Sequence, residues 1–325
     1  MWMRSVCKFV LMLSCCLAAV GTSQAADFPA KPVKFVVPFT PGTGPDRLAR
    51  LVAEDLGKTW KVPVVVENRL GASGHVGAQV VGQSPPDGYT VGVMATNISL
   101  TAHLIKSEGF VPMRDLAPLT IAGYGDMTLV VSGKSRFNTL RDLLDYARQH
   151  PRELAFASAG MGSPAHIFLA QMQQKTGTEF LHVPYKGTAP AVTDLIGGQV
   201  HASFVATHTV APYLASGQLR ALGVAAPQRN SHAPDIPSFA EQGVPDFSTE
   251  AWYGFMLPAG VPEPIAEQLY RDIRASVEQE HVRSQLDKFG LTVRPSTREE
   301  MRQVVDKEYR TYGDIISKYN IKLQE

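Results

Sequence analysis

Cysteine is scarce in this 325-residue chain, and its three copies, Cys7, Cys15 and Cys16, all lie near the beginning. The remainder of the chain therefore has no disulfide bonds and no thiolate chemistry. A small secreted domain would need such cross-links, whereas a chain of about 300 residues buries enough surface to fold without them. Disulfide-stapled folds and cysteine catalysis are excluded for the main part of the sequence.

Long hydrophobic runs are missing as well. The apolar stretch at residues 9–20 is shorter than the roughly 20 residues of a membrane-spanning helix, and no later segment is long enough. It follows Arg4 and Lys8 and precedes small residues, a pattern typical of a secretory signal peptide. We expect residues 1–26 to be a cleaved signal peptide that directs export. An alternative is a lipoprotein box that anchors the chain through Cys15.

Neither sign of charge dominates the composition. The chain has 31 Lys and Arg residues against 30 Asp and Glu residues, a net charge of +1. Without the first 26 residues the balance is 29 against 30, because the leader holds two basic residues and no acidic ones. Proteins that bind nucleic acid or anionic membranes carry a marked basic excess. We therefore predict no nucleic-acid partner.

Familiar catalytic and metal-binding motifs are also absent. No glycine turn continues into Gly-Lys-Ser/Thr, which excludes a P-loop. Ser73 and Ser163 lack the flanking glycines of a nucleophile elbow. The nine histidines form no H-E-x-x-H motif, and the nearest pair, His201 and His208, has no metal-binding spacing. The sequence predicts neither a catalytic residue nor a bound metal.

One stretch fits a dinucleotide-binding pattern and must be weighed. Residues 160–165 read G-x-G-x-x-A after an apolar run. The acidic residue that would hold the ribose should follow the next strand, but Glu179 precedes that strand. In the glycine-containing turn at residues 38–50, Arg47 stands at the position where a dinucleotide-binding motif has its third small residue. We predict no cofactor.

What the sequence does contain is an alternation of short β-branched runs and helical patterns, which is typical of an α/β fold. Strands are predicted at residues 33–37, 62–67 and 89–94. Helices are predicted between them, beginning near Pro45 and Gly77. These elements predict a parallel β-α-β-α-β unit.

A second unit of the same kind follows. After a strand at 119–124, which still belongs to the first unit, its predicted strands are 128–132, 154–158, 180–183, 202–205 and 221–225, and its predicted helices are 140–149, 164–175 and 189–196. The link at residues 123–125 is a predicted crossing between the two units. Two α/β units of this kind predict two lobes with a ligand cleft between them.

The pattern of the C-terminal part of the sequence predicts that it belongs to the first unit. It begins with a strand-like run at 252–257 and continues with a helix at 264–278 and one or two helices at 297–319. The predicted architecture is two α/β lobes joined by two crossings, which close about a hinge around a ligand. Its predicted domains are lobe 1, residues 27–124 plus 250–325, and lobe 2, residues 125–249.

Two glycine-rich turns are the strongest candidates for a ligand site. They are PFTPGTGPDRLAR at residues 38–50 and ASAGMGSPAH at residues 157–166. Each follows an apolar strand and ends in a proline at a helix start. Free amides and the positive end of the helix dipole make such turns receptors for anions. Two of them facing a cleft could hold a carboxylate without an arginine.

Several side chains near these turns have two interpretations. Asp46 either caps the first helix or contacts ligand, and Phe39 either walls the cleft or belongs to the core. Ser163 is interpreted as a helix N-cap whose hydroxyl also reaches the ligand. Lys186 either attracts an anion or is a solvated loop residue. Residues 252–253 are expected to pack the return strand.

The order of the sequence blocks resembles a known family, the periplasmic receptors of tripartite tricarboxylate transporters, often called the Bug family. From about Phe28 onward the similar blocks are PFTPGTGPDRLAR, VVVENRLGASGHVGA, PPDGYT, ASAGMGSPAH, HVPYKGTAPAVTDLIGGQV and GQLRALGV. The resemblance implies a type II periplasmic binding-protein fold. It also implies that amides, hydroxyls and ordered water from the two glycine turns grip ligand carboxylates.

Carried over by position, the resemblance implies a set of ligand-binding residues. They are Phe39, Thr40, Gly42, Thr43, Gly44 and Asp46 from the first turn, Thr96 and Asn97 after the third strand, Ser158, Ala159, Gly160, Gly162, Ser163 and His166 from the second turn, and Val205. Two departures matter. Thr43 stands where relatives mostly have glycine, and residues 204–207 are largely apolar where many relatives carry an acidic or polar side chain.

The predicted function is therefore that of a periplasmic solute-binding protein, not an enzyme. It would close on a small organic carboxylate, a di- or tricarboxylate or an aromatic acid without an amine, because a buried ammonium needs a paired acceptor. It would act as a monomer and deliver the acid to a two-component membrane permease. The alternatives are a periplasmic sensor that feeds a signalling receptor and a secreted α/β hydrolase.

Overall fold

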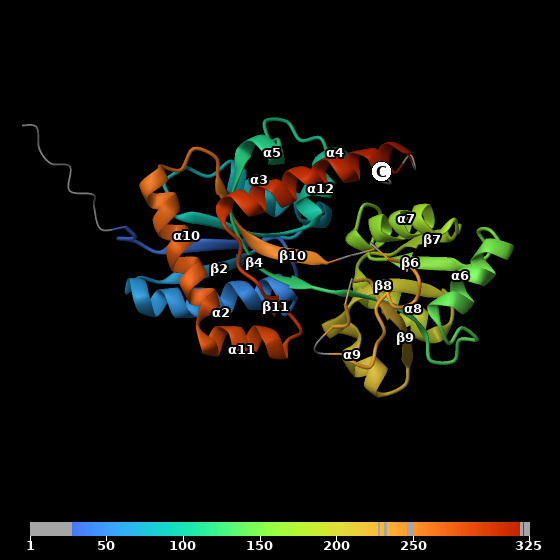
Figure 1. Ribbon diagram of the computed structural model, residues 1–325. Coiled ribbons are helices and arrows are strands. Elements are labelled where there is room, and N and C mark those ends of the chain that lie inside the picture. Colours follow the sequence, from blue (N-terminus) through green and yellow to red (C-terminus); the bar gives the residue numbers. More distant parts are fainter. Residues whose placement is uncertain are drawn as a thin grey trace, which may run out of the picture.

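The chain folds into two lobes that lie side by side (Figure 1). The structure is a computed structural model, drawn in Figure 1, and it describes residues 28–226, 228–230, 233–245, 247, 250–318 and 321. Each lobe is a β-sheet with helices on both faces, which confirms the predicted α/β fold with two lobes. The predicted signal peptide and the alternative anchor at Cys15 lie outside the described residues.

Lobe 1 is built on a six-stranded sheet. Its spatial order is β11 (Thr292–Val293), β4 (Leu116–Gly125), β10 (Ala251–Pro258), β3 (Thr90–Ala95), β1 (Val33–Val37) and β2 (Val64–Asn68). The pairs β1–β2 and β1–β3 are parallel, as the β-α-β-α-β pattern predicts. Both faces are covered by helices, and in β1 every residue except Lys34 is apolar and buried.

The helices of lobe 1 form one layer on each face of this sheet. One layer is α2 (Gly44–Trp60), α10 (Glu263–Glu278) and α11 (Glu280–Lys288); the other is α3 (His75–Gly82), α4 (Asn97–Leu104) and α12 (Arg298–Lys318), with the short α5 (Pro112–Asp115) beside it. Residues of β1 alternate between the two layers: Val33, Phe35 and Val37 join the α2 side and Val36 joins the α3 side.

Lobe 2 is built on a five-stranded sheet. Its spatial order is β7 (Leu181–Pro184), β6 (Ala155–Ser158), β8 (Ala202–Ala206), β5 (Met127–Ser132) and β9 (Leu219–Val224). One face packs on α6 (Leu140–Gln149) and α7 (Pro164–Thr176), the other on α8 (Thr188–Gly197) and α9 (Thr207–Ala215). Helix α6 begins with a capping box in which Thr139 Oγ1 accepts from the Asp142 amide at 3.1 Å.

The two crossings between the lobes lie next to each other. Strand β4 ends at Gly125 in one sheet and β5 begins at Met127 in the other, close to the predicted link. The return crossing leads into β10, which pairs Ala251 with Gly125. Arg294 touches both crossings, because its guanidinium lies 3.9 Å from the ring centre of Tyr124 and 3.2 Å from Glu250 Oε2.

A small hydrophobic cluster also joins the lobes, and we call it the seam cluster. It consists of Leu100 from α4, Ile167 and Ala170 from α7, Tyr312 and Ile315 from α12, and Ile321. Helix α12 ends beside α7, so the last described helix of lobe 1 reaches lobe 2 (Figure 1). The lobes are therefore in contact at the seam cluster as well as at the crossings.

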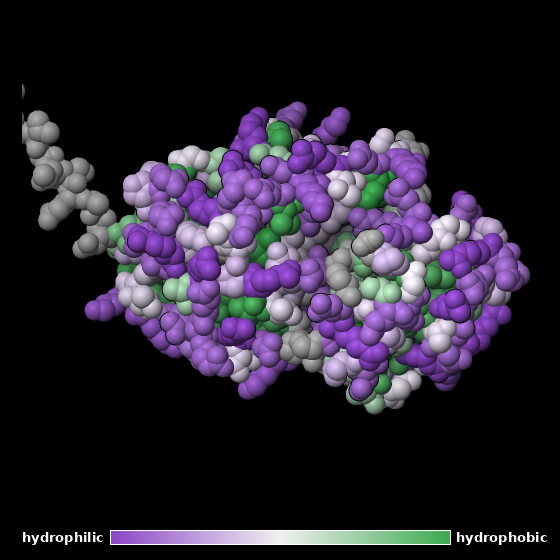
Figure 2. Space-filling model, viewed as in Figure 1, coloured by the Kyte–Doolittle hydropathy of each residue, from purple (hydrophilic) through white to green (hydrophobic). Residues whose placement is uncertain are grey.

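The surface is mostly polar on the face shown in Figure 2, where hydrophilic residues predominate and hydrophobic ones form small separate groups. Within the described residues no helix is both long and apolar enough to span a membrane.

Candidate ligand-binding site

A cavity of about 520 Å³ lies between the two lobes. The first residues of α2, α4, α7 and α8 all line it: Gly44, Asn97, Pro164 and Thr188. The start of α9 lines it through His208, and Gly74, the N-cap of α3, also contributes. Parallel strands end at the same edge of each sheet, so the helices that follow them begin at that edge. The topology thus brings six helix N-termini to one cavity.

The first glycine turn is held in shape by Asp46, which lies behind it. Gly42 has a φ of +83° and donates its amide to Asp46 Oδ2 at 2.8 Å. Arg50 Nε (3.0 Å) and Asn68 Nδ2 (2.8 Å) donate to the same carboxylate, and Asp46 is only 2% exposed. Burial alone would raise the pKa of Asp46, but the hydrogen bonds from Arg50, Asn68 and Gly42 outweigh it and lower the pKa. Asp46 is ionised and fully engaged by protein donors.

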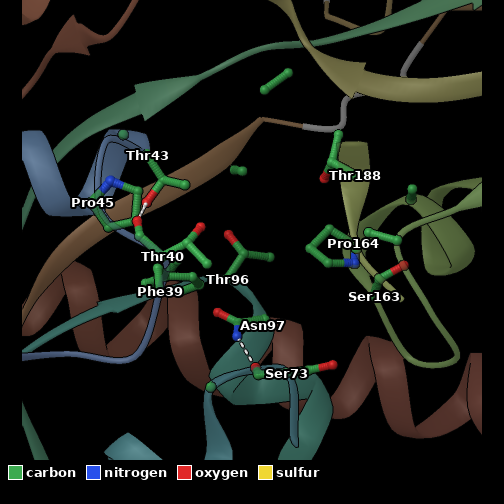
Figure 3. Close-up of a pocket in the computed structure, with 18 of the residues that line it drawn as sticks. Phe39, Thr40, Thr43, Pro45, Ser73, Thr96, Asn97, Ser163, Pro164 and Thr188 are labelled. Carbon is green, nitrogen blue, oxygen red and sulfur yellow. Dashed lines mark hydrogen bonds between the residues drawn. The ribbon is translucent and has the colours of Figure 1, made fainter. Parts of the chain in front are cut away.

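Thr43 occupies the N-cap position of α2, but its hydroxyl caps nothing. Thr43 Oγ1 donates to the Thr40 carbonyl at 2.7 Å (Figure 3), and it makes no cap bond to α2. The single hydroxyl proton is therefore already used within the turn, leaving acceptor lone pairs towards the cavity. The first-turn amide of Gly44 has no intrahelical carbonyl to bond.

A second segment of lobe 1 reaches the cavity after β2. Residues 71–74 line the wall, with Ala72 and Ser73 at φ values of +46° and +53°. Such angles are uncommon for residues with a side chain and persist where the surroundings enforce them. Asn97 Nδ2 donates to the Ser73 carbonyl (Figure 3), which ties this turn to the start of α4. Thr96 accepts from the Trp252 amide at 2.9 Å.

The second glycine turn places Ser163 directly opposite, on lobe 2 (Figure 3). Ser163 lies at the N-cap of α7 and is 4% exposed, but its Oγ has no hydrogen-bond partner among the described residues. A buried hydroxyl without a partner is rare in a folded protein. The predicted position at the N-cap is present, whereas the capping bond is not.

A stacked pair of histidines, His166 and His182, holds the second glycine turn in shape. His166 Nδ1 accepts from the Gly162 amide at 3.2 Å, and its ring stacks on His182 with ring centres 3.8 Å apart. His182 Nε2 lies 2.6 Å from Ser158 Oγ. Burial lowers the pKa of His166 to about 4, and burial together with His166 lowers that of His182 to about 3. Both rings are therefore neutral at pH 7.

Lobe 2 contributes further polar groups to the wall. Thr188 begins α8, and Ser203 lies on β8 with its hydroxyl donated to the Ala157 carbonyl at 2.9 Å. His208 and Thr209 come from the first turn of α9. Tyr253 of β10 completes the wall beside the crossings. Leu70, Met127, Phe204 and Val205 supply apolar surface.

The described lining residues include no Asp, Glu, Lys or Arg. The positive potential of the cavity therefore comes from the helix N-termini and their amides rather than from a cation. Within the described residues no group of three or more His, Cys, Asp and Glu side chains could hold a metal. The arrangement favours a small anion that accepts hydrogen bonds.

The residues predicted to bind ligand fall into two groups. Those on the cavity wall are Phe39, Thr40, Thr43, Gly44, Thr96, Asn97, Ala159, Ser163 and Val205. Those outside the lining are Gly42, Asp46, Ser158, Gly160, Gly162 and His166. The polar groups of the second set are bonded within the turns, as with Gly42 and Asp46, so they shape the turns instead of forming the wall.

Several wall residues were not among the predicted ones. They are chiefly Leu70 to Gly74, Gly187, Thr188, Ser203, His208, Thr209 and Tyr253. The sequence carried a signal for two of these segments, because they lie in the blocks VVVENRLGASGHVGA and HVPYKGTAPAVTDLIGGQV. Tyr253 was expected to pack the return strand; it does so and also lines the cavity.

The fold and the cavity together define a two-lobed solute-binding protein with a cavity between its lobes. A family profile described as "Tripartite tricarboxylate transporter family receptor" matches residues 48–321. BugT of Bordetella pertussis is 32% identical over 310 residues, covering 94% of this chain and 95% of BugT. The chain belongs to this family of tripartite tricarboxylate transporter receptors.

Solved structures of relatives have the same architecture. Rpa4515 of R. palustris, determined with adipate, is 31% identical with a TM-score of 0.82, over 92% of this chain and all of that one. MatC of Rhodopseudomonas palustris, with bound malate, is 29% identical with a TM-score of 0.77, over 89% of this chain and all of that one. Both relatives are bound to dicarboxylic acids.

Proposed function

We propose that this protein captures a small organic carboxylate in the periplasm by closing its two lobes, and delivers the acid to a two-component membrane permease. The family and the two liganded relatives support a carboxylate as the ligand. The observation that carries the proposal is the cavity itself. Six helix N-termini and the unpartnered Ser163 hydroxyl meet there, on a wall whose described residues hold no charged side chain.

The two glycine turns act as a clamp from opposite lobes. Thr40, Gly44 and Thr96 line the cavity from lobe 1, and Ser163 and Ala165 line it from lobe 2. One carboxylate held by both sides ties the lobes together, which favours the closed state by the difference in affinity between closed and open protein. Gly42, Asp46, Gly162 and His166 keep these donors in place.

The wall also supports an acid without an amine. A buried ammonium requires an acidic or carbonyl partner, and the described lining contains no carboxylate. The hydrocarbon part of the acid would lie against Met127, Phe204 and Val205. A cavity of about 520 Å³ has room for a longer diacid or an aromatic acid as well as a four-carbon acid.

A thermal-shift screen tests this function. The protein is heated with malate, adipate, citrate, benzoate, an amino acid and a sugar, and a specific ligand raises the melting temperature by mass action. We expect at least one acid to raise it and the amino acid and sugar to leave it unchanged. Stabilisation by amines or sugars alone would contradict the proposal. Purification with the permease subunits in the presence of the acid tests delivery.

A further inference from the structure

His208 has a fixed position at the start of α9, on the lobe 2 side of the cavity. The preceding residue, Thr207, donates its amide and its hydroxyl to the Asp126 carbonyl, each at 3.0 Å. Its hydroxyl also lies 2.7 Å from Thr128 Oγ1. Asp126 is the residue between β4 and β5, so the first turn of α9 is bonded to the crossing itself.

The His208 side chain touches the opposite lobe. Its ring packs on Phe289 with ring centres 4.6 Å apart, and a Cβ at Gly290 would lie 3.0 Å from His208 Cβ. The guanidinium of Arg47 lies 4.5 Å from the ring centre of Phe289. A residue of lobe 2 that lines the cavity thus forms part of the contact with lobe 1.

The imidazole is incompletely bonded. Nδ1 of His208 is buried and has no hydrogen-bond partner among the described residues. A neutral imidazole offers one donor and one acceptor. His208 is also the one imidazole among the described lining residues. An oxygen of a bound acid is a suitable partner for this ring, and no described protein group fills that place.

We propose that His208 contacts the ligand and determines its selectivity: the imidazole hydrogen-bonds an oxygen of the bound acid at the point where the lobes meet. This inference rests on the proposed carboxylate function and adds a side chain to a site otherwise formed by helix N-termini. The bond is made only when the lobes hold His208 against Phe289, so the same residue senses the acid and the closed contact.

Protonation of the ring provides a distinctive signature. Burial, and the charge of Arg47, lower the pKa of His208 to about 4 in the empty protein. Arg47 is the charged group that faces the ring from α2; Phe289 and Gly290 carry no charge, and Tyr253 is the other titratable wall residue. An anionic ligand beside the ring raises its pKa, so the complex binds a proton that the empty protein lacks. Affinity should therefore increase as the pH falls below 7.

The test compares two variants with the wild type, using the tightest binder among malate, adipate, citrate and benzoate. His208→Phe keeps the stack on Phe289 but removes the hydrogen bond, and we expect its Kd to rise roughly 10- to 100-fold. His208→Gln keeps a polar group and should bind more tightly than His208→Phe. His150→Gln, at the exposed C-cap of α6 and stacked on Tyr146, is the matched control and should bind like the wild type.

The pH dependence separates ligand contact from a merely structural role. We expect the ratio of Kd for His208→Gln to Kd for the wild type to increase roughly threefold from pH 7.5 to 5.5. The titration of the acid itself is common to both proteins and cancels. A constant ratio, or a Kd for His208→Phe within twofold of the wild type, would overturn the inference. If the wild type binds no acid, the proposed function fails instead.

Discussion

Ser163 and Thr43 occupy equivalent N-cap positions in the two lobes, yet their hydroxyls differ. Thr43 donates to its own turn, at the Thr40 carbonyl, while the Ser163 hydroxyl has no partner in the part of the chain that the structure describes. Residue type at an N-cap predicts a capping bond, and in both places that bond is absent. The hydroxyl of Thr43, which the sequence suggested as a selector of the acid, can accept from a ligand, but donating to one would break its bond to Thr40.

Ser163→Ala tests the assignment of the free hydroxyl. Removing a donor to a charged ligand should raise Kd about tenfold, whereas the free energy of unfolding should stay within roughly 0.5 kcal/mol of the wild type, since Oγ bonds none of the described residues. Calorimetry and urea unfolding measure the two effects.

Thr139→Ala is the matched control for Ser163→Ala. Thr139 makes a true capping box, so its loss should lower stability by about 1 kcal/mol and leave Kd unchanged. Loss of stability without loss of affinity in Ser163→Ala would show that its hydroxyl serves the helix and not the ligand.

Asp46 is expected to act through the shape of the turn. Asp46→Asn replaces an acceptor with an amide donor facing the Gly42 amide or Arg50, and should lower stability by about 2 kcal/mol at pH 7. The pKa of Asp46 is lowered in the folded protein, so its contribution is present above the unfolded pKa near 3.8 and is lost as pH falls through the folded value.

Urea unfolding at pH 7 and at pH 3 measures this contribution. The gap in stability between the wild type and Asp46→Asn should be smaller at pH 3. A gap of the same size at both values would mean that the charge of Asp46 is not what holds the turn.

Among the elements, α12 carries an unusual acid. Glu308 accepts from Trp252 Nε1 at 2.8 Å and from Ser99 Oγ at 3.2 Å, so its carboxyl faces β10 and α4 although the residue as a whole is partly exposed. Burial of the carboxyl raises its pKa to about 8, against the smaller opposing effect of these two donors. The carboxyl is mostly protonated at pH 7.

A raised pKa in the folded state makes stability fall with increasing pH. Glu308 makes its full contribution to the free energy of unfolding below its unfolded pKa of 4.5, and this contribution is lost as pH rises to about 8. Between pH 5 and 8 the free energy of unfolding of the wild type should therefore fall by roughly 3 kcal/mol relative to that of Glu308→Gln. The glutamine keeps an acceptor but cannot ionise. Urea unfolding at both values checks this, and parallel pH profiles would contradict it.

The helices differ in how clearly the sequence predicts them. The helix at residues 140–149 was predicted with the observed bounds, because an amphipathic pattern and Thr139 mark it. Helices α4 and α9 were not predicted, since each begins directly at the end of a strand without a glycine or proline to mark the change. The closing segment was expected as one or two helices and is the single α12.

At the scale of the molecule, local pattern gave the two α/β units and their crossings, but not the complete cavity wall. Which helix starts meet depends on strand order, and the order β10-β3-β1-β2 places β3 and β2, which lead into α4 and α3, on either side of β1, which leads into α2. Residues 71–74 enter the wall for this reason, and Thr188 enters it from lobe 2, where α8 follows β7. His208 could not be assigned from sequence because its partner, Phe289, lies in the other lobe.

An anion site made of neutral donors should respond weakly to salt. Surface charges act over a Debye length of about 10 Å at 0.1 M salt and are screened beyond it. Kd for the tightest acid of the panel should therefore change less than about threefold between 50 and 500 mM NaCl. Calorimetry across this range checks the expectation, and a steep dependence would point to Lys186 or an arginine close to the ligand.

The seam cluster has a practical consequence for engineering. Ile321 packs with Ile167 and Ala170 of lobe 2, so this residue beyond α12 lies at the junction between the lobes. A fluorescent protein fused near it would sense the proposed closure of the lobes. The described chain begins at the far end of lobe 1 (Figure 1), which makes that end the better site for an immobilisation tag and the α12 end the better site for an optical reporter.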